Sequence, residues 1–193
     1  MSKLTREDLF SLEKYAEVRN DFRKKVIEHK KNRRLELTPN IVLYFEDALT
    51  MQYQVQEMLR IERIFEAAGI QEELDVYNPL VPDGSNWKAT FMVEYDEENE
   101  RRQALARLVG IEGRIWMRIE GSEAVHPIAN EDLERSTDDK TASVHFVRFE
   151  LTPAMVAALK GGARLMAGVD HPACQASVEV PDNVRASLMG DLA

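Results

Sequence analysis

The stretch DALTMQYQVQEMLRIERIFEAAG, from Asp47 to Gly69, predicts the helix around which the rest of the chain is organised. As one continuous helix it would span about 30 Å, the width of a small domain. Its apolar side chains project over more than half of the helix circumference, a wider arc than on an ordinary surface helix. They are Met51, Val55, Met58, Leu59, Ile61, Ile64, Phe65 and Ala68. We therefore expect a central helix that is buried on most sides.

Three polar residues fall inside this apolar arc, namely Gln54, Glu57 and Glu62. The clearly polar side of the helix is narrower and carries Gln52, Gln56, Arg60 and Arg63. A buried carboxylate costs several kcal/mol unless it is paired or neutralised. The two glutamates therefore need arginines or a metal from other segments, or they form part of a site.

The composition is that of an ordinary globular protein. The chain has 193 residues, enough for one sizeable core, with 44% hydrophobic and 31% charged residues. No internal repeat, low-complexity tract or convincing boundary divides it. We expect a single domain over residues 1–193.

Several classes of function are disfavoured by the same features. No apolar run approaches the roughly 20 residues that span a membrane. The N-terminal sequence MSKLTREDLF lacks the apolar core of a signal peptide, which predicts a cytoplasmic protein. The single cysteine, Cys174, excludes an internal disulfide and a multi-cysteine zinc or iron–sulfur site within one chain. The formal charge of −9 disfavours nucleic acid, whose binding depends on neutralising phosphates.

An N-terminal helix is predicted from Thr5, as its N-cap, to about Arg33. Its apolar stripe consists of Leu12, Tyr15, Val18, Phe22, Val26 and His29. The second half of this helix is basic, which is typical of a solvated face or of a patch for an acidic partner or nucleic acid. The same outer face also carries Glu13, Glu17, Asp21 and Glu28. This mixture of charges favours the solvated face.

Alternation of apolar and polar residues predicts strands. Three such runs are Trp87–Tyr95, Arg114–Glu120 and Ser143–Leu151, and Arg34–Glu46 has the pattern of a hairpin. Half-buried alternation favours an antiparallel sheet. We expect the three runs in one antiparallel sheet packed against the long, largely buried central helix, in an α+β fold with an N-terminal helix.

Residues typical of helix starts and ends mark the limits of the remaining helices. A helix is expected from Asp96 to Gly110, and another over Thr152–Gly162, where Thr152 is the cap and the paired glycines end it. A last helix begins at Pro181. The segment Gly121–Ala142 is polar and long for a connection, as lids and disordered loops often are.

The strongest candidate site combines polar residues of the central helix with polar residues of the predicted strands. Its members are Gln54, Glu57, Arg60, Glu62, Arg118, His145, Arg148 and Glu150. One interpretation is a buried ion-pair network that fixes the helix against the sheet. The other is a polar pocket for an anionic or zwitterionic ligand, in which Arg148 is the fork that holds a carboxylate or phosphate. Arg148 is also the predicted partner of Glu57 or Glu62, so Arg148→Met is expected to destabilise the protein by roughly 3 kcal/mol or more.

The sequence also contains candidate metal ligands. Glu46, Glu57 and Glu62 with His145 or His171 have the chemistry of metal ligands, but no predicted helix carries the Glu-x-x-His pair of carboxylate di-iron bundles. We therefore expect no bound metal.

The segment Asp170–His171 with Cys174 is a weaker candidate for an activated thiol. The paired glycines, Gly161 and Gly162, match neither the P-loop nor the dinucleotide fingerprint. No residue pattern identifies a catalytic group or a cofactor.

Three blocks resemble an uncharacterised bacterial family of unknown function: YQVQEMLRIERI (Tyr53–Ile64), SVHFVRFEL (Ser143–Leu151) and GVDHPA (Gly168–Ala173). The blocks WKATFMVEY and GIEGRIWMRI also fit that family, so the resemblance covers nearly the whole chain. Genes of the family often lie beside a rubrerythrin-like protein and an iron–sulfur oxidoreductase. The resemblance implies a cytosolic role in peroxide defence or electron transfer.

Two hypotheses of function follow. The first is a non-enzymatic accessory protein that docks onto a rubrerythrin-like protein or an iron–sulfur oxidoreductase. The second is an enzyme that binds a small anionic or zwitterionic ligand in a pocket between helix and sheet, lined by Glu and Arg. Exposed apolar residues on the central helix of a monomer would indicate a homo-oligomer.

Overall fold

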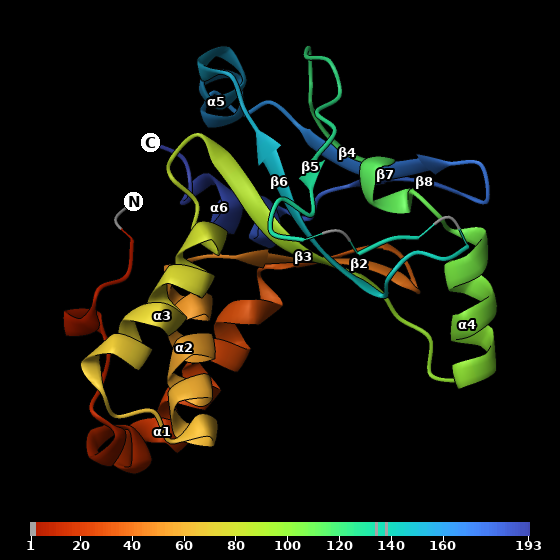
Figure 1. Ribbon diagram of the computed structural model, residues 1–193. Coiled ribbons are helices and arrows are strands. Elements are labelled where there is room, and N and C mark those ends of the chain that lie inside the picture. The colour runs from red at the N-terminus through yellow and green to blue at the C-terminus, as the bar shows by residue number, and fades with distance from the viewer. Residues whose placement is uncertain (1–2, 134, 138) are drawn as a thin grey trace.

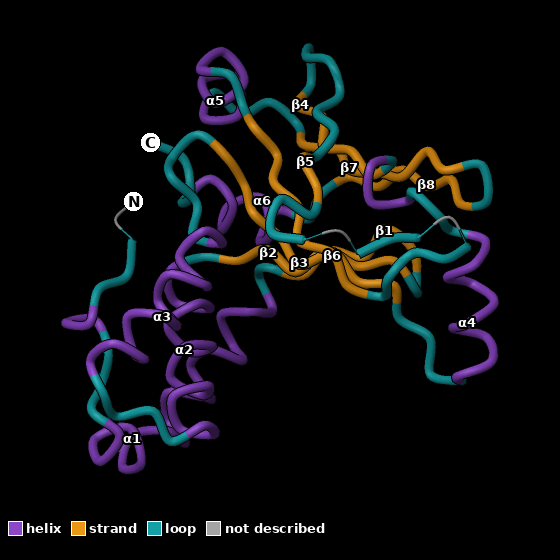
Figure 2. The backbone as a smooth tube through the Cα atoms, in the orientation of Figure 1, coloured by secondary structure: helices purple, strands orange, loops and turns teal. Residues whose placement is uncertain are grey.

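The computed structural model describes residues 3–133, 135–137 and 139–193, which form an α+β fold with six α-helices and two antiparallel sheets (Figure 1). The predicted fold class is confirmed. The two sheets lie one above the other, and three helices project from them as a separate arm (Figure 2). In the described part of the chain, no helix is both long and apolar enough to cross a membrane.

The first sheet contains five strands in the order β1-β2-β3-β6-β5. Its strands are β1 (Arg34–Thr38), β2 (Ile41–Glu46), β3 (Asn86–Val93), β5 (Ile128–Ala129) and β6 (Val144–Glu150). The hairpin β1–β2 and the alternating strands β3 and β6 lie where the sequence predicts them. Trp87, Phe91 and Phe149 on the inner face are fully buried. On the other face, Lys88 of β3 lies directly opposite Arg148 of β6.

The second sheet has three strands in the order β4-β7-β8. They are β4 (Ile115–Ile119), β7 (Leu165–His171) and β8 (Cys174–Glu179). The predicted strand at Arg114–Glu120 is therefore present, but its expected place in one sheet with β3 and β6 is wrong. Alternation predicts that one face of a strand is buried, but it does not identify the neighbouring strand. Ile115 and Met117 of β4 share one continuous core with Trp87 and Phe91 of the first sheet, so the two sheets cover each other.

The helical arm consists of α1 (Leu12–Lys31), α2 (Ala48–Glu62) and α3 (Ala67–Tyr77). The predicted central helix is thus two helices. Arg63 adopts a left-handed backbone conformation with φ of 57°, which ends α2. The chain then reverses, so Leu74 of α3 joins the apolar cluster that contains Val55 and Leu59 of α2. Gly69, expected to end the helix, lies inside α3, where an added Cβ would be 2.8 Å from Cγ2 of Ile64. The absence of a side chain at Gly69 therefore permits close packing of α3 against Ile64.

The expected burial of the central helix is confirmed for one side only. Met51, Val55 and Leu59 are buried, whereas Ile61 and Phe65 are 61% and 67% exposed. Moreover, α2 packs between α1 and α3, and its apolar cluster is separate from the core of the sheets. The predicted packing of a sheet against a long central helix is therefore not the core of this fold. The main core lies between the two sheets.

The N-terminal helix begins later than expected. Thr5 bonds Asp8 at a short 3₁₀ turn, and α1 starts at Leu12 with Ser11 as its N-cap. Exposed ion pairs between charges three residues apart, such as Lys14 with Glu17 and Lys24 with Asp21, occupy its outer face. The solvated-face interpretation of the basic half of this helix is consistent with these pairs.

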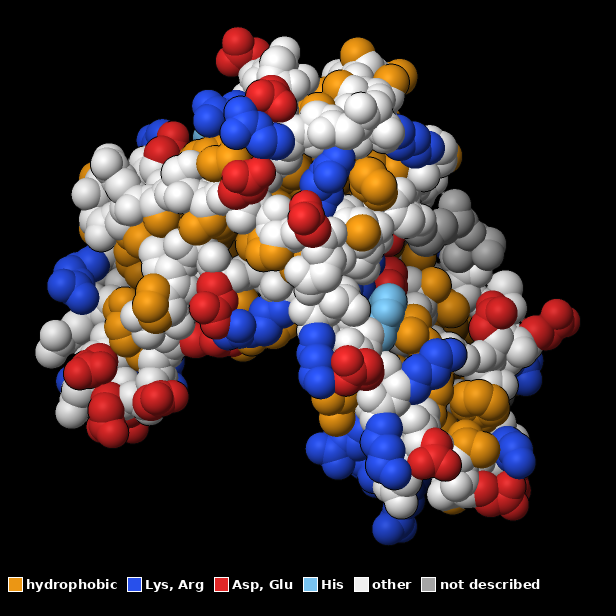
Figure 3. All heavy atoms as spheres, turned by 180° about the vertical axis from the view of Figure 1, so that it is seen from behind, with side chains coloured by type: hydrophobic (Ala, Val, Ile, Leu, Met, Phe, Trp, Pro, Cys, Tyr) orange, Lys and Arg blue, Asp and Glu red, His pale blue; other side chains and the backbone are white. Residues whose placement is uncertain are grey.

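The other three helices lie around the sheets. They are α4 (Glu98–Arg107), α5 (Pro153–Lys160) and α6 (Asp182–Met189), with single 3₁₀ turns at η1 (Arg6–Asp8), η2 (Asn78–Leu80) and η3 (Ile111–Gly113). Thr152 accepts a hydrogen bond from the Met155 N–H and caps α5 as predicted. The helical arm and α4 project from the same side of the sheets, which gives the molecule an arched outline (Figure 3).

Candidate functional site

The predicted network of helix and strand residues is divided between distant parts of the fold. Gln54, Glu57, Arg60 and Glu62 lie on α2 in the helical arm. His145, Arg148 and Glu150 lie on β6 in the first sheet, and Arg118 lies on β4 in the second. Neither Glu57 nor Glu62 pairs with Arg148 in the described residues. The expected helix–sheet network is therefore wrong as a single cluster.

Glu57 nevertheless has an arginine partner from another segment, as predicted. Its Oε1 accepts hydrogen bonds from the Tyr15 hydroxyl (2.6 Å) and from Nε of Arg19 (2.8 Å), and its Oε2 accepts from Nη2 of Arg19 (2.9 Å). Arg60 adds a fourth bond at 3.1 Å. These bonds, foremost those from Arg19, lower the pKa of Glu57 to about 2. The cluster joins α1 to α2, whereas Glu62 is exposed.

His145 is fully buried in a polar network that closes the long loop onto β6. Its Nε2 lies 2.8 Å from Oγ1 of Thr141, and its Nδ1 lies close to the side-chain amide of Asn130. Glu112 is 3.9 Å from Nε2. Burial lowers the pKa of His145. The segment Gly121–Ala142 is thus a tethered connection that contributes β5, and His145 anchors it.

The secondary candidates lie in two separate places, Glu46 at the end of β2 and Asp170 with His171 at the end of β7. Glu46 faces the interior, where it accepts hydrogen bonds from the hydroxyls of Thr50 (2.6 Å) and Thr90 (2.7 Å), while Asp47 caps α2. Asp170 is exposed near the end of β7, the central strand of the second sheet.

Both ring nitrogens of His171 lie within hydrogen-bond distance of backbone atoms. Nε2 lies 3.0 Å from the Val109 carbonyl, and Nδ1 accepts the N–H of Ala173. Burial raises the pKa of Cys174, which is opposite to the shift expected of an activated thiol. The weaker candidate, an activated Cys174 beside His171, therefore has no support from the surroundings of the thiol.

Arg118 stacks over the ring of Trp116, with its guanidinium carbon 5.2 Å from the ring centroid. Within residues 3–133, 135–137 and 139–193, no three His, Cys, Asp or Glu side chains are grouped as metal ligands would be.

A pocket of about 410 Å³ lies between the end of α3 and the outer face of the first sheet. We call it the helix–sheet pocket. Its walls combine apolar side chains from α3 and η2 with Phe146 of β6, and charged residues also line it. The residues that line it are Asp75, Val76, Tyr77, Pro79, Leu80, Lys88, Glu131, Asp132, Phe146, Val147 and Arg148. A pocket of this kind was predicted around Arg148, but α3 forms its helical wall instead of α2.

The guanidinium of Arg148, which lines this pocket, forms two hydrogen bonds to the carboxylate of Glu131. Nε donates to Oε2 of Glu131 at 2.8 Å, and Nη2 donates to Oε1 of the same residue at 2.7 Å. Nη1 donates to Glu150. The hydrogen bonds from Arg148 are the main cause of the lowered pKa of Glu131. The fork geometry expected of Arg148 is present, and Glu131 occupies it.

Lys88 is the second basic residue of the pocket. Its Nζ donates to the carbonyl of Pro79 at 2.5 Å, which brings the end of the side chain to the η2 wall. Burial lowers the pKa of Lys88, and the positive charge of Arg148 lowers it further, while Asp83 opposes both effects. The pairing register of β3 and β6 would have located Lys88 beside Arg148, but register cannot be read from the alternation of either strand alone.

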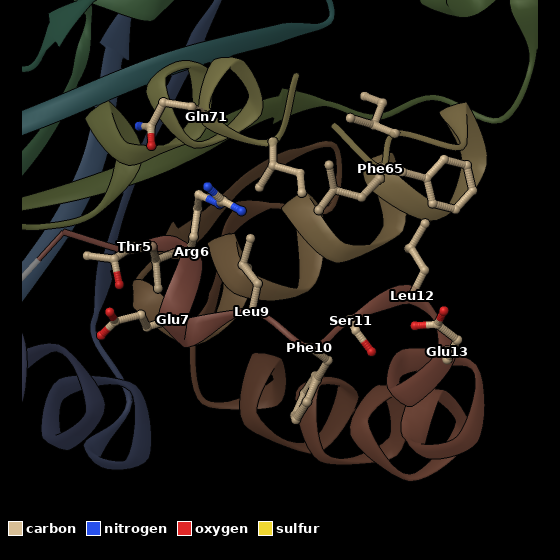
Figure 4. A pocket seen from close by; sticks show the side chains of 14 residues that line it. Thr5, Arg6, Glu7, Leu9, Phe10, Ser11, Leu12, Glu13, Phe65 and Gln71 are labelled. Carbon is tan, nitrogen blue, oxygen red and sulfur yellow. The ribbon is translucent and has the colours of Figure 1, made fainter. Parts of the chain in front are cut away.

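A larger open groove of about 930 Å³ lies in the helical arm, between the N-terminal segment and the reversal after α2. Leu9, Leu12 and Phe65 surround it, with Glu7 and Glu13 toward opposite ends (Figure 4). It is wide and open, and no cluster of buried charged groups faces it in the described residues. This groove is suited to a large apolar surface more than to a small charged ligand.

Sequence reasoning missed Arg33, which is the most deeply buried charged residue in the described part of the chain. Arg33 is 2% exposed, and its Nη2 donates to Oδ2 of Asp191 at 2.6 Å and to the Glu46 carbonyl at 3.0 Å. Asp47 lies 3.4 Å from Nε and also contacts His29. Burial raises the pKa of Asp191 to about 6, against the opposing effect of Arg33. This cluster joins α1, the first sheet and the C-terminal segment.

Comparison with known proteins gives a family and a close structural relative. A model of the family described as protein of unknown function (DUF3501) matches residues 3–192. The chain is also similar to a crystal structure described as a novel protein of unknown function from Burkholderia pseudomallei K96243, with 52% sequence identity, coverage of 100% of both chains and a TM-score of 0.94. No curated protein matches. The predicted resemblance to a family of unknown function is confirmed, and its redox association stays a prediction.

Proposed function

The chain belongs to the DUF3501 family of proteins of unknown function. We propose that it binds a small carboxylate with an apolar tail in the helix–sheet pocket. Arg148 holds the carboxylate, and the side chains of α3 and η2 cover the tail. The observation that carries the proposal is the two-pronged contact between Arg148 and the carboxylate of Glu131.

Glu131 marks the position that a ligand carboxylate takes. Planar guanidinium groups recognise carboxylates through two parallel hydrogen bonds, so the fork accepts any carboxylate that reaches it. The side chain of Glu131 is 52% exposed. Ion pairs between exposed groups contribute only about 0.2–1 kcal/mol. Replacement of Glu131 by a ligand therefore costs little.

The rest of the pocket fits an apolar tail. Its volume of about 410 Å³ lies within the roughly 300–1,000 Å³ typical of small-ligand sites. Val76 is 63% exposed, although it stands beside Tyr77 and Leu80 in an apolar wall. Each CH₂ group buried against such a wall contributes about 0.8 kcal/mol. Binding thus combines charge recognition at Arg148 with apolar burial at α3.

The experiment is a calorimetric titration with hexanoate as the probe. Wild type should bind hexanoate, and Arg148→Met should weaken binding about tenfold or more, because hydrogen bonds to a charged group contribute about 1.5–3 kcal/mol. Arg164→Met is the matched control, since Arg164 also pairs with a glutamate, Glu120, but outside this pocket. Equal affinity of wild type and Arg148→Met, or no binding to wild type, would contradict the proposal.

A second candidate function is docking onto a redox partner through the groove of the helical arm. The observation in its favour is the exposure of two large apolar side chains, Ile61 (61%) and Phe65 (67%), of which Phe65 borders the groove. The partner expected from the family resemblance is a rubrerythrin-like protein or an iron–sulfur oxidoreductase. Contiguous exposed apolar surface is typical of protein–protein contacts.

Sedimentation of the purified chain with each purified partner tests this second function. Docking predicts a complex that is lost in Phe65→Ser and retained in Ile27→Ser, because Ile27 is similarly exposed on α1 but outside the groove. Sedimentation of the chain alone as a dimer that dissociates in Phe65→Ser would assign the groove to a second copy of the chain. A monomer that binds neither partner would remove the docking function.

A further inference from the structure

We propose that Lys88 captures the carbonyl carbon of a bound oxo acid as a reversible imine, so the ligand class of the helix–sheet pocket is short oxo acids with an apolar tail. This inference rests on the proposed binding of a carboxylate by Arg148. It adds a chemical step and narrows the ligand from any carboxylate to one that carries a ketone or aldehyde group.

The positions of the two basic residues support this step. Lys88 and Arg148 are register partners on neighbouring antiparallel strands, and both line the same pocket. Directly opposite residues place their side chains on one face of a sheet, within contact of each other. A ligand whose carboxylate is held by Arg148 therefore presents its adjacent atoms to the amine of Lys88.

The surroundings of Lys88 favour a nucleophilic amine. The side chain is half-buried beside the apolar wall of the pocket, and its Nζ bonds the carbonyl of Pro79 instead of a carboxylate. Burial is the main cause of its lowered pKa, and the charge of Arg148 lowers the pKa further, against the opposing charges of Asp83, Glu131 and Glu150. Desolvation and a neighbouring cation are the two means by which proteins activate lysines for imine formation.

The step balances without any further reactant. The ammonium group of Lys88 first releases one proton to solvent. The nitrogen lone pair then attacks the carbonyl carbon, a C–N bond forms, and the carbonyl oxygen becomes a hydroxyl. Loss of that oxygen with the two former amine protons gives one water molecule and a C=N bond. No electrons are gained or lost, and addition of water reverses the reaction.

Trapping by reduction is the test, with 2-oxohexanoate as the probe and cyanoborohydride as the added reductant. Wild type should acquire a single adduct, located on Lys88 by peptide mapping, and hexanoate should compete with its formation. Lys88→Met and Lys88→Arg should both lose the adduct, while Lys24→Met, a control at an exposed lysine on α1, should keep it. Arg148→Met should slow trapping about tenfold or more, because the carboxylate is no longer oriented.

The outcomes separate this inference from the proposed function. If hexanoate binds and no adduct forms on Lys88, or if adducts spread over exposed lysines without competition, the imine is overturned and the carboxylate site stands. If hexanoate does not bind, both the imine and the proposed carboxylate site are contradicted. As an independent readout, the trapping rate should reach its plateau at lower pH than with free N-acetyl-lysine, because the pKa of Lys88 is lowered. A profile identical to that of the free lysine would contradict activation by the pocket.

Discussion

The junction around Arg33 and the pocket around Arg148 use the same pair of groups in opposite ways. Arg33 is 2% exposed and bonds a carboxylate, Asp191, that is equally buried. The side chain of Arg148 is 25% exposed, and its partner Glu131 is 52% exposed on a loop at the edge of a pocket. One arginine is sealed between elements, and the other is open to an incoming molecule.

Burial, more than the identity of the pair, therefore decides whether an ion pair is structural or exchangeable. Removing one partner of a buried pair leaves an uncompensated charge, which costs about 3–5 kcal/mol. An exposed pair contributes about 0–1 kcal/mol, so either partner can leave. Variants at these sites test this contrast.

The largest effect is expected for Arg33→Met. The variant leaves Asp191 without its cation in the interior and removes donors to two backbone carbonyls, so the free energy of unfolding should fall by about 3–5 kcal/mol. Urea denaturation measures the change. Arg164→Met, at an exposed pair, is the control and should change stability by no more than about 0.5 kcal/mol. Similar small losses of stability in both variants would contradict the structural role of the Arg33–Asp191 pair.

A smaller, pH-dependent effect is expected at Glu57, whose cluster is intermediate in burial. Its pKa is lowered to about 2 from 4.5, so the folded state binds the proton less well than the unfolded state. The stabilisation is therefore complete above pH 4.5 and lost as the pH falls from 4.5 toward 2. At neutral pH, Glu57→Gln should cost about 2 kcal/mol, a value reduced for partial exposure.

Denaturation of wild type and Glu57→Gln over this acid range provides the check on Glu57. The difference in stability between the two proteins should shrink as the pH falls. A difference that stays constant down to pH 2 would show that the carboxylate charge is not what joins α1 to α2.

At the open pocket, Arg148→Met should cost at most about 1 kcal/mol, because both carboxylates that it leaves behind are solvated. This replaces the roughly 3 kcal/mol expected when Arg148 was assigned to a buried glutamate of the central helix. Urea denaturation beside Arg33→Met gives the direct contrast. A loss as large as that of Arg33→Met would mean that the two arginines play the same structural role.

The smallest effect is an improvement. Glu131 competes with a ligand carboxylate for Arg148, so Glu131→Gln should bind hexanoate about two- to fivefold more tightly, the range expected from an exposed ion pair. Calorimetric titration of the variant measures it. Asp132→Gln is the matched control, because Asp132 also lines the pocket but bonds Arg135. Weaker binding by Glu131→Gln would indicate that Glu131 supports the ligand instead of competing with it.

Local patterns were sufficient for most elements of this fold. Strict alternation in WKATFMVEY and SVHFVRFEL predicts β3 and β6, and Thr152 with Pro153 predicts the start of α5. The same patterns did not place β4 in its own sheet, since alternation describes one strand and pairing involves two. The reversal at Arg63 was also missed, because a left-handed arginine has no signature comparable to a glycine.

Long-range pairs account for the misplaced site. Asp191 lies 158 positions from Arg33, and Glu131 reaches Arg148 only because β5 pairs with β6. The apolar arc on α2 correctly indicated that Glu57 needs a cation. The basic second half of the N-terminal helix, which begins with Arg19, was interpreted as a solvated face, although Arg19 follows buried Tyr15 by one helical turn. That spacing was the available clue.

Titration of the wild-type protein with hexanoate and with hexanamide tests the central claim most directly. The two molecules have the same apolar tail and differ in the charge that Arg148 is proposed to hold. If the pocket recognises a carboxylate through Arg148, hexanoate should bind about tenfold or more tightly than hexanamide, and Arg148→Met should remove that preference. Equal affinity for the two molecules in wild type would contradict the account, because Arg148 would then have no role in ligand recognition.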